Sequence, residues 1–117
     1  MYGINEIDSA GLAAELASNP DGVRLIDVRS PAEMVQGMIP GAEPMPLHLL
    51  PLRMQEIAGD PRRVVLYCRS GARSAQACMY LANQGLGGNV WNLRGGIIDW
   101  VRQGHPVERP AEAHLAG

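Results

Sequence analysis

Lysine and phenylalanine are absent from this sequence of 117 residues, and only two of its residues are cysteines. All ten cationic side chains are therefore arginines, whose planar, fork-shaped guanidinium groups suit oxyanions. Two cysteines are too few for a disulfide scaffold or a tetrahedral zinc site, and we expect no metal and no other cofactor. A core without phenylalanine has to be built from Leu, Ile, Val, Met and Ala.

An excess of positive charge and long apolar runs are also missing. Ten basic and twelve acidic residues give a net charge of −2 and a pI near 5.9, which does not favour nucleic acid or an anionic membrane surface as a partner. No run of 18 apolar residues exists, so no membrane span is predicted. Residues 1–10 carry no cation, and no signal peptide is expected. The simplest expectation is a cytoplasmic protein.

The length of the chain predicts one domain. Apolar residues make up 46% and charged residues 19%, which is typical of a globular protein. We expect a single domain over residues 1–108. Residues 109–117 show no periodicity and are expected to form a flexible tail. Nothing in the pattern indicates an oligomeric state.

Short apolar runs alternate with helical patterns along the chain. The expected strands are residues 3–7, 23–28, 45–47, 64–67 and 89–92, and the expected helices are 9–19, 30–37, 48–58, 74–85 and 96–103. Strands that alternate with helices at these spacings predict βα units and a parallel sheet. The expected fold is α/β, with three layers: a mainly parallel five-stranded sheet and helices on both of its faces.

Two helix starts carry local signals. Ser9 is the expected N-cap of the first helix. Ser30, followed by Pro31 and by Glu33 three residues later, is typical of a capping box at the start of a short helix. Gly37 is expected to end that helix.

The loop after the fourth expected strand carries the chemistry. It reads Cys68-Arg69-Ser70-Gly71-Ala72-Arg73-Ser74, between a buried strand and a helix. Free amides of the loop, the helix dipole and the charges of Arg69 and Arg73 would all favour a thiolate, and such surroundings lower a cysteine pKa to about 3.5–7.5. Gly71 permits a tight turn with positive φ. We expect Cys68 to be ionised and accessible to attack; the plainer alternative is a buried thiol.

The second cysteine carries a different expectation. Cys78 shares a helical stripe with Ala75, Met79 and Ala82, which predicts that it faces the core. A buried structural thiol is therefore favoured over a thiol that resolves an oxidised Cys68.

With these motifs in place, the sequence resembles the single-domain rhodaneses, a family of thiosulfate-type sulfurtransferases. The matching stretches, in the order of the family, are Leu25-Ile26-Asp27-Val28-Arg29, Ile39-Pro40-Gly41-Ala42, Tyr67 to Ser74, Asn92-Leu93-Arg94-Gly95-Gly96 with Trp100, and Gly104-His105-Pro106-Val107. Together they extend over nearly the whole chain, from about residue 3 to residue 108. One departure is Met38, where the family often has histidine; that position is interpreted as structural.

The resemblance implies sulfur transfer through Cys68. Its thiolate would take the outer sulfur of a small anionic donor, such as thiosulfate or a related persulfide, and would pass it to cyanide, a thiol or a sulfur-carrier protein. By position in the motif, the residues that would bind the donor are Arg69, Ser70, Gly71, Ala72, Arg73 and Ser74. Asp27 and Arg29 match a pair at a strand end and are interpreted first as ion-pair partners that support the loop.

Three alternatives stay open at this point. The first is a sulfur-relay protein that a partner protein loads, with little turnover of small donors. The second is a regulatory binding module without chemistry, which an intact Cys68 disfavours. The third is a cysteine phosphatase or an arsenate reductase. Only four residues separate Cys68 from Arg73, one fewer than in the phosphatases of similar fold, and a smaller loop favours a single sulfur atom over a phosphate.

Overall fold

The computed structural model describes residues 4–110, which fold around one parallel five-stranded sheet. The strands are β1 (Asn5–Ile7), β2 (Val23–Asp27), β3 (Glu43–Pro44), β4 (Arg63–Tyr67) and β5 (Val90–Leu93). Their order across the sheet is β1-β5-β4-β2-β3, so β4 lies at the centre.

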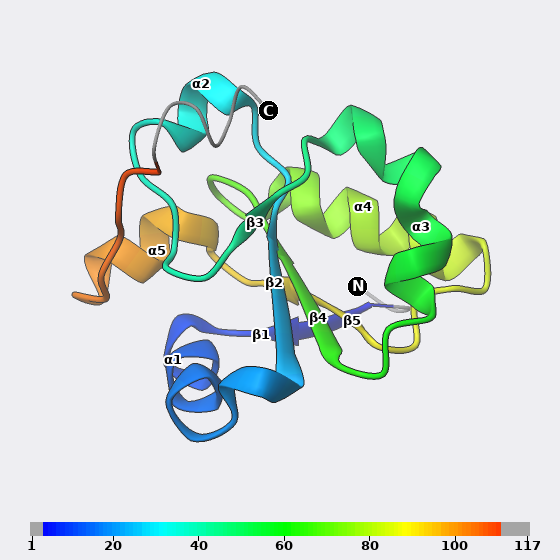
Figure 1. The fold of residues 1–117 in the computed structure, drawn as a ribbon, viewed down its shortest axis with the longest axis horizontal. Coiled ribbons are helices and arrows are strands. Elements are labelled where there is room, and N and C mark those ends of the chain that lie inside the picture. The colour runs from blue at the N-terminus through cyan, green and yellow to red at the C-terminus, as the bar shows by residue number, and fades with distance from the viewer. Residues whose placement is uncertain (1–3, 111–117) are drawn as a thin grey trace.

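Helices cover both faces of this sheet (Figure 1). They are α1 (Ser9–Ser18), α2 (Pro31–Met34), α3 (Leu50–Ala58), α4 (Ala72–Asn83) and α5 (Gly96–Arg102), with 3-10 turns at Pro20–Gly22 and Leu47–Leu49. Helices α1 and α5 lie on one face, and α3 and α4 lie on the other (Figure 1). The predicted three-layer α/β fold is confirmed.

The central strand β4 is buried on both faces. Val64 and Leu66 pack in the core beneath α3 and α4, and Val65 and Tyr67 pack in the core beneath α1 and α5. Because side chains alternate along a strand, Cys68 then falls on the α3/α4 side. The continuous apolar run in the sequence reflects this burial on two faces.

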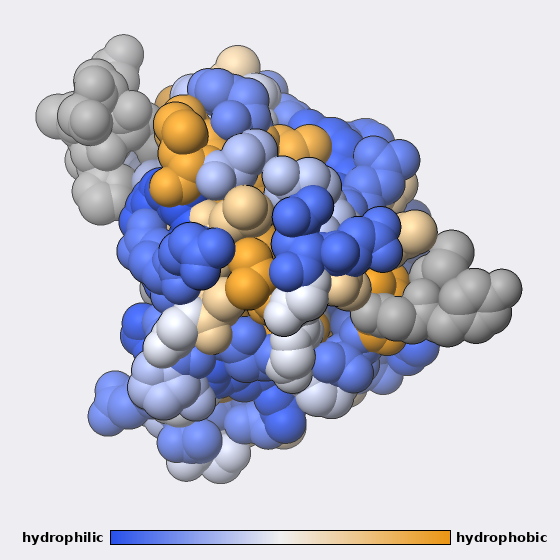
Figure 2. All heavy atoms as spheres, turned by 90° about the vertical axis from the view of Figure 1, so that its right-hand side faces the viewer, coloured by the Kyte–Doolittle hydropathy of each residue, from blue (hydrophilic) through white to orange (hydrophobic). Residues whose placement is uncertain are grey.

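The surface on the α3/α4 side carries only small apolar patches, which hydrophilic side chains separate (Figure 2). Among residues 4–110, no helix is both long and apolar enough to pass through a bilayer.

The two predicted helix starts have different outcomes. At α1, Asp8 rather than Ser9 is the N-cap: its carboxylate accepts a hydrogen bond from the amide of Gly11 at 2.8 Å. The Ser9 hydroxyl instead donates to the carboxylate of Asp99 at 2.8 Å, which ties α1 to α5. Because the Ser9 hydroxyl bonds to Asp99 on another helix, Asp8 caps α1.

At α2 the predicted capping box is confirmed. The amide of Glu33 donates to the Ser30 hydroxyl at 3.3 Å, and the amide of Ser30 donates to the Glu33 carboxylate at 3.1 Å. The helix ends at Met34, three residues before Gly37.

The strand predicted at 45–47 is wrong. The strand is β3, and it ends at Pro44, two residues before Pro46, which has no amide hydrogen to donate. Leu47 already begins a 3-10 turn that leads into α3. The amide of Met45 still donates to the carbonyl of Asp27 at 2.9 Å, so the chain stays close to β2 after β3 ends.

The helix α4 begins at Ala72 and is rotated relative to the prediction. Its buried residues are Ser74, Ala77, Cys78 and Leu81, whereas Ala75, Met79 and Ala82 are only half-buried. Of the predicted stripe, Cys78 alone is fully buried. Ser74 lies in the first turn of this helix and is buried.

Ordered pairing continues past Val107. Met38 and Glu108 form an antiparallel bridge with backbone hydrogen bonds of 2.7 and 2.8 Å, so Glu108 is not frayed. Of the predicted flexible tail, residues 111–117 lie outside the described residues.

Candidate active site

The sulfur of Cys68 lies at the centre of the loop that follows β4. Its Sγ accepts hydrogen bonds from the amide of Gly71 at 3.1 Å and from the amide and hydroxyl of Ser74, both at 3.4 Å. The predicted convergence of loop amides on the sulfur is confirmed. Ser70 and Ala72 lie on the exposed side of the same loop.

Two glycines allow the loop to close around the sulfur. Gly71 has φ +98°, a left-handed conformation that suits glycine. Gly96, at the start of α5, has φ +61°, and a Cβ there would lie 2.3 Å from the carbonyl oxygen of Arg69. This close approach lets the amide of Ile97 donate to the carbonyl of Cys68 at 3.0 Å. The start of α5 therefore holds the first half of the loop in place.

The surroundings of Cys68 act on its thiol in opposite directions. Burial raises the pKa of Cys68, and the hydrogen bonds that its sulfur accepts lower it. The donors, from the largest effect to the smallest, are the Ser74 hydroxyl and the amides of Ser74, Gly71 and Arg73. The net result is a pKa below the usual 9.0 for a thiol. Hydrogen bonds from the loop are therefore the largest effects that favour the thiolate, and the charge of Arg73 also interacts favourably with it.

The expected accessibility of this sulfur is wrong for this structure. Cys68 is 0% exposed. The loop wraps around the sulfur because its amides donate to it. The groups that favour the thiolate therefore also bury the sulfur. A donor can reach the sulfur only when this packing opens.

The guanidinium group of Arg73 is held by a carboxylate beside the loop. Its two terminal nitrogens donate to the two carboxylate oxygens of Glu33 at 2.8 and 2.9 Å. The hydrogen bonds from Arg73 lower the pKa of Glu33 to about 2. The sequence predicted a positive charge free to face an anionic donor, whereas in the structure this charge is shared with the capping-box glutamate of α2.

Arg69 is exposed and stands at a pocket of about 360 Å³ between α2 and α5. The pocket is lined by Arg29, Glu33, Gln36, Gly37, Arg69, Ile97, Ile98, Val101 and Val107. The pocket combines two arginines with an aliphatic wall. One of these arginines, Arg69, directly follows Cys68 in the sequence. Arg29 is paired with Asp27, so Arg69 is the positive charge that this pocket offers to an anionic molecule.

Asp27 and Arg29 form the ion pair that the resemblance implies. The Arg29 guanidinium donates to both carboxylate oxygens of Asp27, at distances from 2.7 to 3.1 Å, and to the carbonyl of Gly37 at 2.6 Å. Asp27 is 0% and Arg29 6% exposed. A buried, paired arginine of this kind anchors the segment that leads from β2 to α2. Glu33 lies in α2.

A polar chain behind the sulfur was not predicted from the sequence. The Ser74 hydroxyl donates to the side-chain oxygen of Asn92 at 2.6 Å, and the Asn92 nitrogen donates to Glu6 at 3.0 Å. Asn92 begins the stretch Asn92 to Gly96, which the sequence comparison had already singled out, and it directly precedes the buried Leu93 on β5. This placement is the signal from which Asn92 could have been found. Only the sheet order, which places β5 beside β4, brings it behind the loop.

Cys78 lies in the core, 2% exposed. Burial, together with the charge of Glu6, raises the pKa of its thiol to about 12. The prediction of a buried structural thiol agrees with this position.

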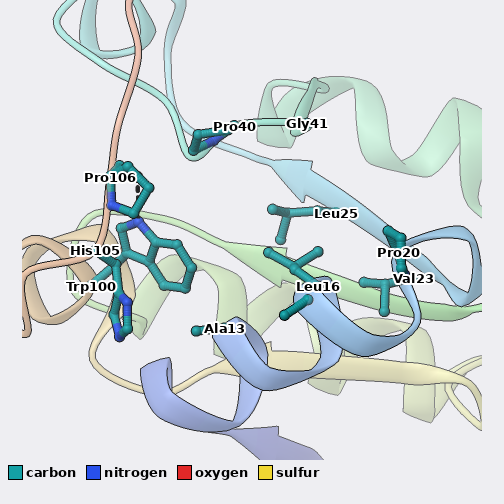
Figure 3. Close-up of a pocket in the computed structure, with 11 residues that line it drawn as sticks. Ala13, Leu16, Pro20, Val23, Leu25, Pro40, Gly41, Trp100, His105 and Pro106 are labelled. Atoms are coloured by element: carbon teal, nitrogen blue, oxygen red, sulfur yellow. Dashed lines mark hydrogen bonds between the residues drawn. The ribbon is translucent and has the colours of Figure 1, made fainter.

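An apolar pocket of about 420 Å³ lies away from Cys68, on the α1/α5 face (Figure 3). Trp100, His105 and Pro106 form one wall and Leu16 of α1 faces them (Figure 3). None of its lining side chains is an acid, an arginine or a cysteine, so the pocket offers little chemistry. Within residues 4–110, no group of three or more His, Cys, Asp or Glu side chains is arranged to hold a metal ion.

Comparison with known families gives one match, to the rhodanese-like domain over residues 9–103. A sulfurtransferase of Allochromatium vinosum is 59% identical over 107 residues, which cover 92% of this chain and 97% of that protein.

The solved structures of similar fold include the following two. A thiosulfate sulfurtransferase from Pseudomonas aeruginosa has a TM-score of 0.82 at 29% identity and covers 92% of this chain, which corresponds to 21% of that longer protein. A possible tyrosine phosphatase from Rhodopseudomonas palustris has a TM-score of 0.81 at 28% identity, covering 90% of this chain and 85% of that one.

Proposed function

This chain belongs to the rhodanese-like sulfurtransferases, and from that premise we propose that it moves a sulfane sulfur from thiosulfate or a related persulfide donor to a thiophilic acceptor through a persulfide on Cys68. The observation that carries the proposal is the set of amide and hydroxyl donors that converge on the Cys68 sulfur and lower the pKa of its thiol.

The first half-reaction loads the enzyme. The Cys68 thiolate attacks the outer sulfur of thiosulfate, a new S–S bond forms, and the bond between the outer sulfur and the sulfonate breaks. Sulfite leaves with the electron pair of that bond, and the terminal sulfur of the persulfide keeps the negative charge that it carried in thiosulfate. The loop amides that point at Cys68 are placed to stabilise an anion there.

The second half-reaction unloads it. A nucleophile such as cyanide or a thiolate attacks the terminal sulfur, the S–S bond breaks, and Cys68 leaves as a thiolate. Because the loop lowers the pKa of Cys68, that thiolate is a good leaving group. The same donors thus serve both halves of a double displacement.

The acceptor and the cellular location of the reaction are proposals that rest on the sequence alone. A thiol or a sulfur-carrier protein is the proposed acceptor in the cell, and the cytoplasm is the proposed location. In the relay alternative, a partner protein loads Cys68 and thiosulfate is turned over poorly. The burial of Cys68 supports that alternative, since contact with a partner is one way to open the loop.

The direct test is sulfur uptake on Cys68. Purified protein is incubated with thiosulfate or with a protein persulfide, and intact mass and released sulfite are measured. We expect a gain of one sulfur atom with either donor, one sulfite per sulfur gained from thiosulfate, and no gain in Cys68→Ala.

The control is Cys78→Ala, which should load normally because that thiol lies away from the loop. Loading only by the protein persulfide would establish the relay alternative. No loading of folded protein by any donor would refute the proposal. Hydrolysis of an aryl phosphate that is lost in Cys68→Ser would establish a phosphatase instead.

The two arginines should affect donors according to charge. Arg69→Ala should slow loading by thiosulfate about tenfold, and Arg73→Ala less, since Glu33 already neutralises part of the Arg73 charge. A small alkyl persulfide, which carries no sulfonate, should lose less in both variants. The measurement is the loading rate by intact mass. Equal losses for both donors would show that the arginines act on Cys68 rather than on the donor.

A further inference from the structure

The polar chain behind Cys68 links three elements of the sheet and its helices. Ser74 lies in the first turn of α4, Asn92 on β5 and Glu6 on β1. Ser74 is 0% and Asn92 1% exposed, whereas Glu6 reaches the surface. A buried amide and a buried hydroxyl must satisfy each other or the groups next to them, because an unpaired polar group is costly away from solvent.

The Ser74 hydroxyl has one proton and three acceptors around it. The oxygen of Asn92 lies at 2.6 Å, the carbonyl of Gly71 at 3.3 Å and the Cys68 sulfur at 3.4 Å. A hydroxyl donates to one acceptor at a time in good geometry, and the Asn92 oxygen is much the nearest. Asn92 therefore competes with the sulfur for the Ser74 hydroxyl, a donor that can turn. The amide donors of the loop have no such alternative.

Asn92 competes only because its amide is held in one orientation. Its nitrogen donates to the carboxylate of Glu6 at 3.0 Å and to the carbonyl of Gly71 at 3.3 Å. Turning the amide over would place its oxygen against these two acceptors, which is unfavourable. Glu6 and the Gly71 carbonyl thus keep the Asn92 oxygen facing Ser74.

We propose that Asn92, oriented by Glu6, is a positioning residue that draws the Ser74 hydroxyl proton away from the Cys68 sulfur, weakens the hydrogen bond between them and so tunes the nucleophile. The inference rests on the proposed function only in taking Cys68 as the nucleophile. Its tests do not require sulfur transfer.

A reason for such tuning lies in thiolate chemistry. A donor that stabilises a thiolate increases the ionised fraction but weakens each thiolate as a nucleophile. The loop amides already favour ionisation, so a stronger hydrogen bond from Ser74 would add ionisation only at the expense of the nucleophilicity of each thiolate. By drawing the hydroxyl away, Asn92 preserves the nucleophilicity of the thiolate that the loop amides favour.

The test is Asn92→Ala, measured as a titration of Cys68 by thiolate absorbance, with Cys68→Ala as reference. Without the competing oxygen, the hydroxyl turns to the sulfur, and the titration midpoint should fall by about one pH unit. The alkylation rate on the high-pH plateau should fall about threefold for that shift, because nucleophilicity decreases with pKa. A merely structural role would not move these two quantities in this linked way.

A double variant shows whether Ser74 carries the effect. In Ser74→Ala the hydroxyl is gone, so adding Asn92→Ala should leave the midpoint of that variant unchanged. Asn89→Ala is the matched structural control: that side chain donates only to backbone carbonyls at the far end of the sheet, including those of Ile57 and Asp60. It should reduce stability without moving the midpoint.

A second variant keeps the proposal testable if Asn92→Ala does not fold. Glu6→Gln lets the Asn92 amide turn over, and should lower the midpoint by a smaller amount than Asn92→Ala. Glu15→Gln removes an equal charge from an ion pair with Arg63 and should leave the midpoint in place. An unchanged midpoint in both Asn92→Ala and Glu6→Gln would overturn the proposal, and so would a shift that persists without the Ser74 hydroxyl.

Discussion

The two cysteines are ten residues apart and equally buried, at 0% and 2% exposure, yet the pKa values of their thiols are shifted in opposite directions. Burial raises the pKa of Cys78 to about 12. The same burial acts on Cys68, but hydrogen bonds bring the pKa of its thiol below the ordinary value. At equal burial, the supply of hydrogen-bond donors therefore decides in which direction the pKa of each thiol is shifted.

The supply of donors follows from position along α4. Cys68 lies just before the helix, where the amides of the first turn have no partner within the helix. Cys78 lies in its interior, where every amide is already bonded to the preceding turn. One helix therefore provides a site for a thiolate at its start and an apolar surrounding for a neutral thiol further along.

The largest expected effect is selective labelling. At neutral pH a pKa of about 12 leaves a thiolate fraction on the order of 10⁻⁵ at Cys78. Iodoacetamide should therefore label Cys68 at least a hundredfold faster than Cys78, as measured by peptide mass. The rate should fall as pH decreases through the Cys68 pKa.

Unfolding the protein should remove this difference and label both cysteines at similar rates. A folded protein in which Cys68 resists the reagent as long as Cys78 does would mean that the loop does not open, and would contradict the proposed function.

A smaller effect is expected from displacing the loop. A Cβ at Gly96 would lie 2.3 Å from the Arg69 carbonyl and 2.7 Å from that of Cys68, so Gly96→Ala must move the first half of the loop. Because a displacement near 1 Å at a reacting group can cost about a hundredfold in rate, sulfur uptake should fall by up to that factor. The pKa of Cys68 should rise towards that of Cys78.

Gly104→Ala is the matched control. Gly104 also has a positive φ, but a Cβ there meets nothing within 4 Å. This variant should lose about 1–2 kcal/mol of stability through backbone strain and keep full sulfur uptake. Equal losses of uptake in both variants would show that the loop is not held by α5.

The smallest effect concerns Cys78 and stability. Its folded pKa is raised, so the folded state keeps a proton that the unfolded chain releases above about pH 9. The stabilisation is complete below pH 9 and is lost as pH rises towards 12, by at most about 1.4 kcal/mol per pH unit. Denaturant unfolding of Cys68→Ser and of Cys68→Ser with Cys78→Ala, compared above pH 9, measures it. Parallel curves would mean that the Cys78 pKa is not raised.

Local pattern was enough for much of the fold and for the nucleophile. The alternation of apolar runs predicted the sheet, and the capping box at Ser30 and Glu33 was readable because both partners lie within one turn. The strand predicted at 45–47 and the N-cap predicted at Ser9 were wrong, because Pro46 has no amide hydrogen to donate and because the Ser9 hydroxyl donates to Asp99 of α5.

What the sequence determined by itself is therefore the α/β fold, the cysteine at the end of a buried strand and the glycine that turns the loop. Tertiary structure alone decided that Glu33 neutralises Arg73, that Asn92 and Glu6 stand behind Ser74, and that the sulfur is covered. The physical reason is sequence distance: these partners lie 40 and 86 residues apart along the chain, and only the packing of strands and helices brings them within hydrogen-bonding reach.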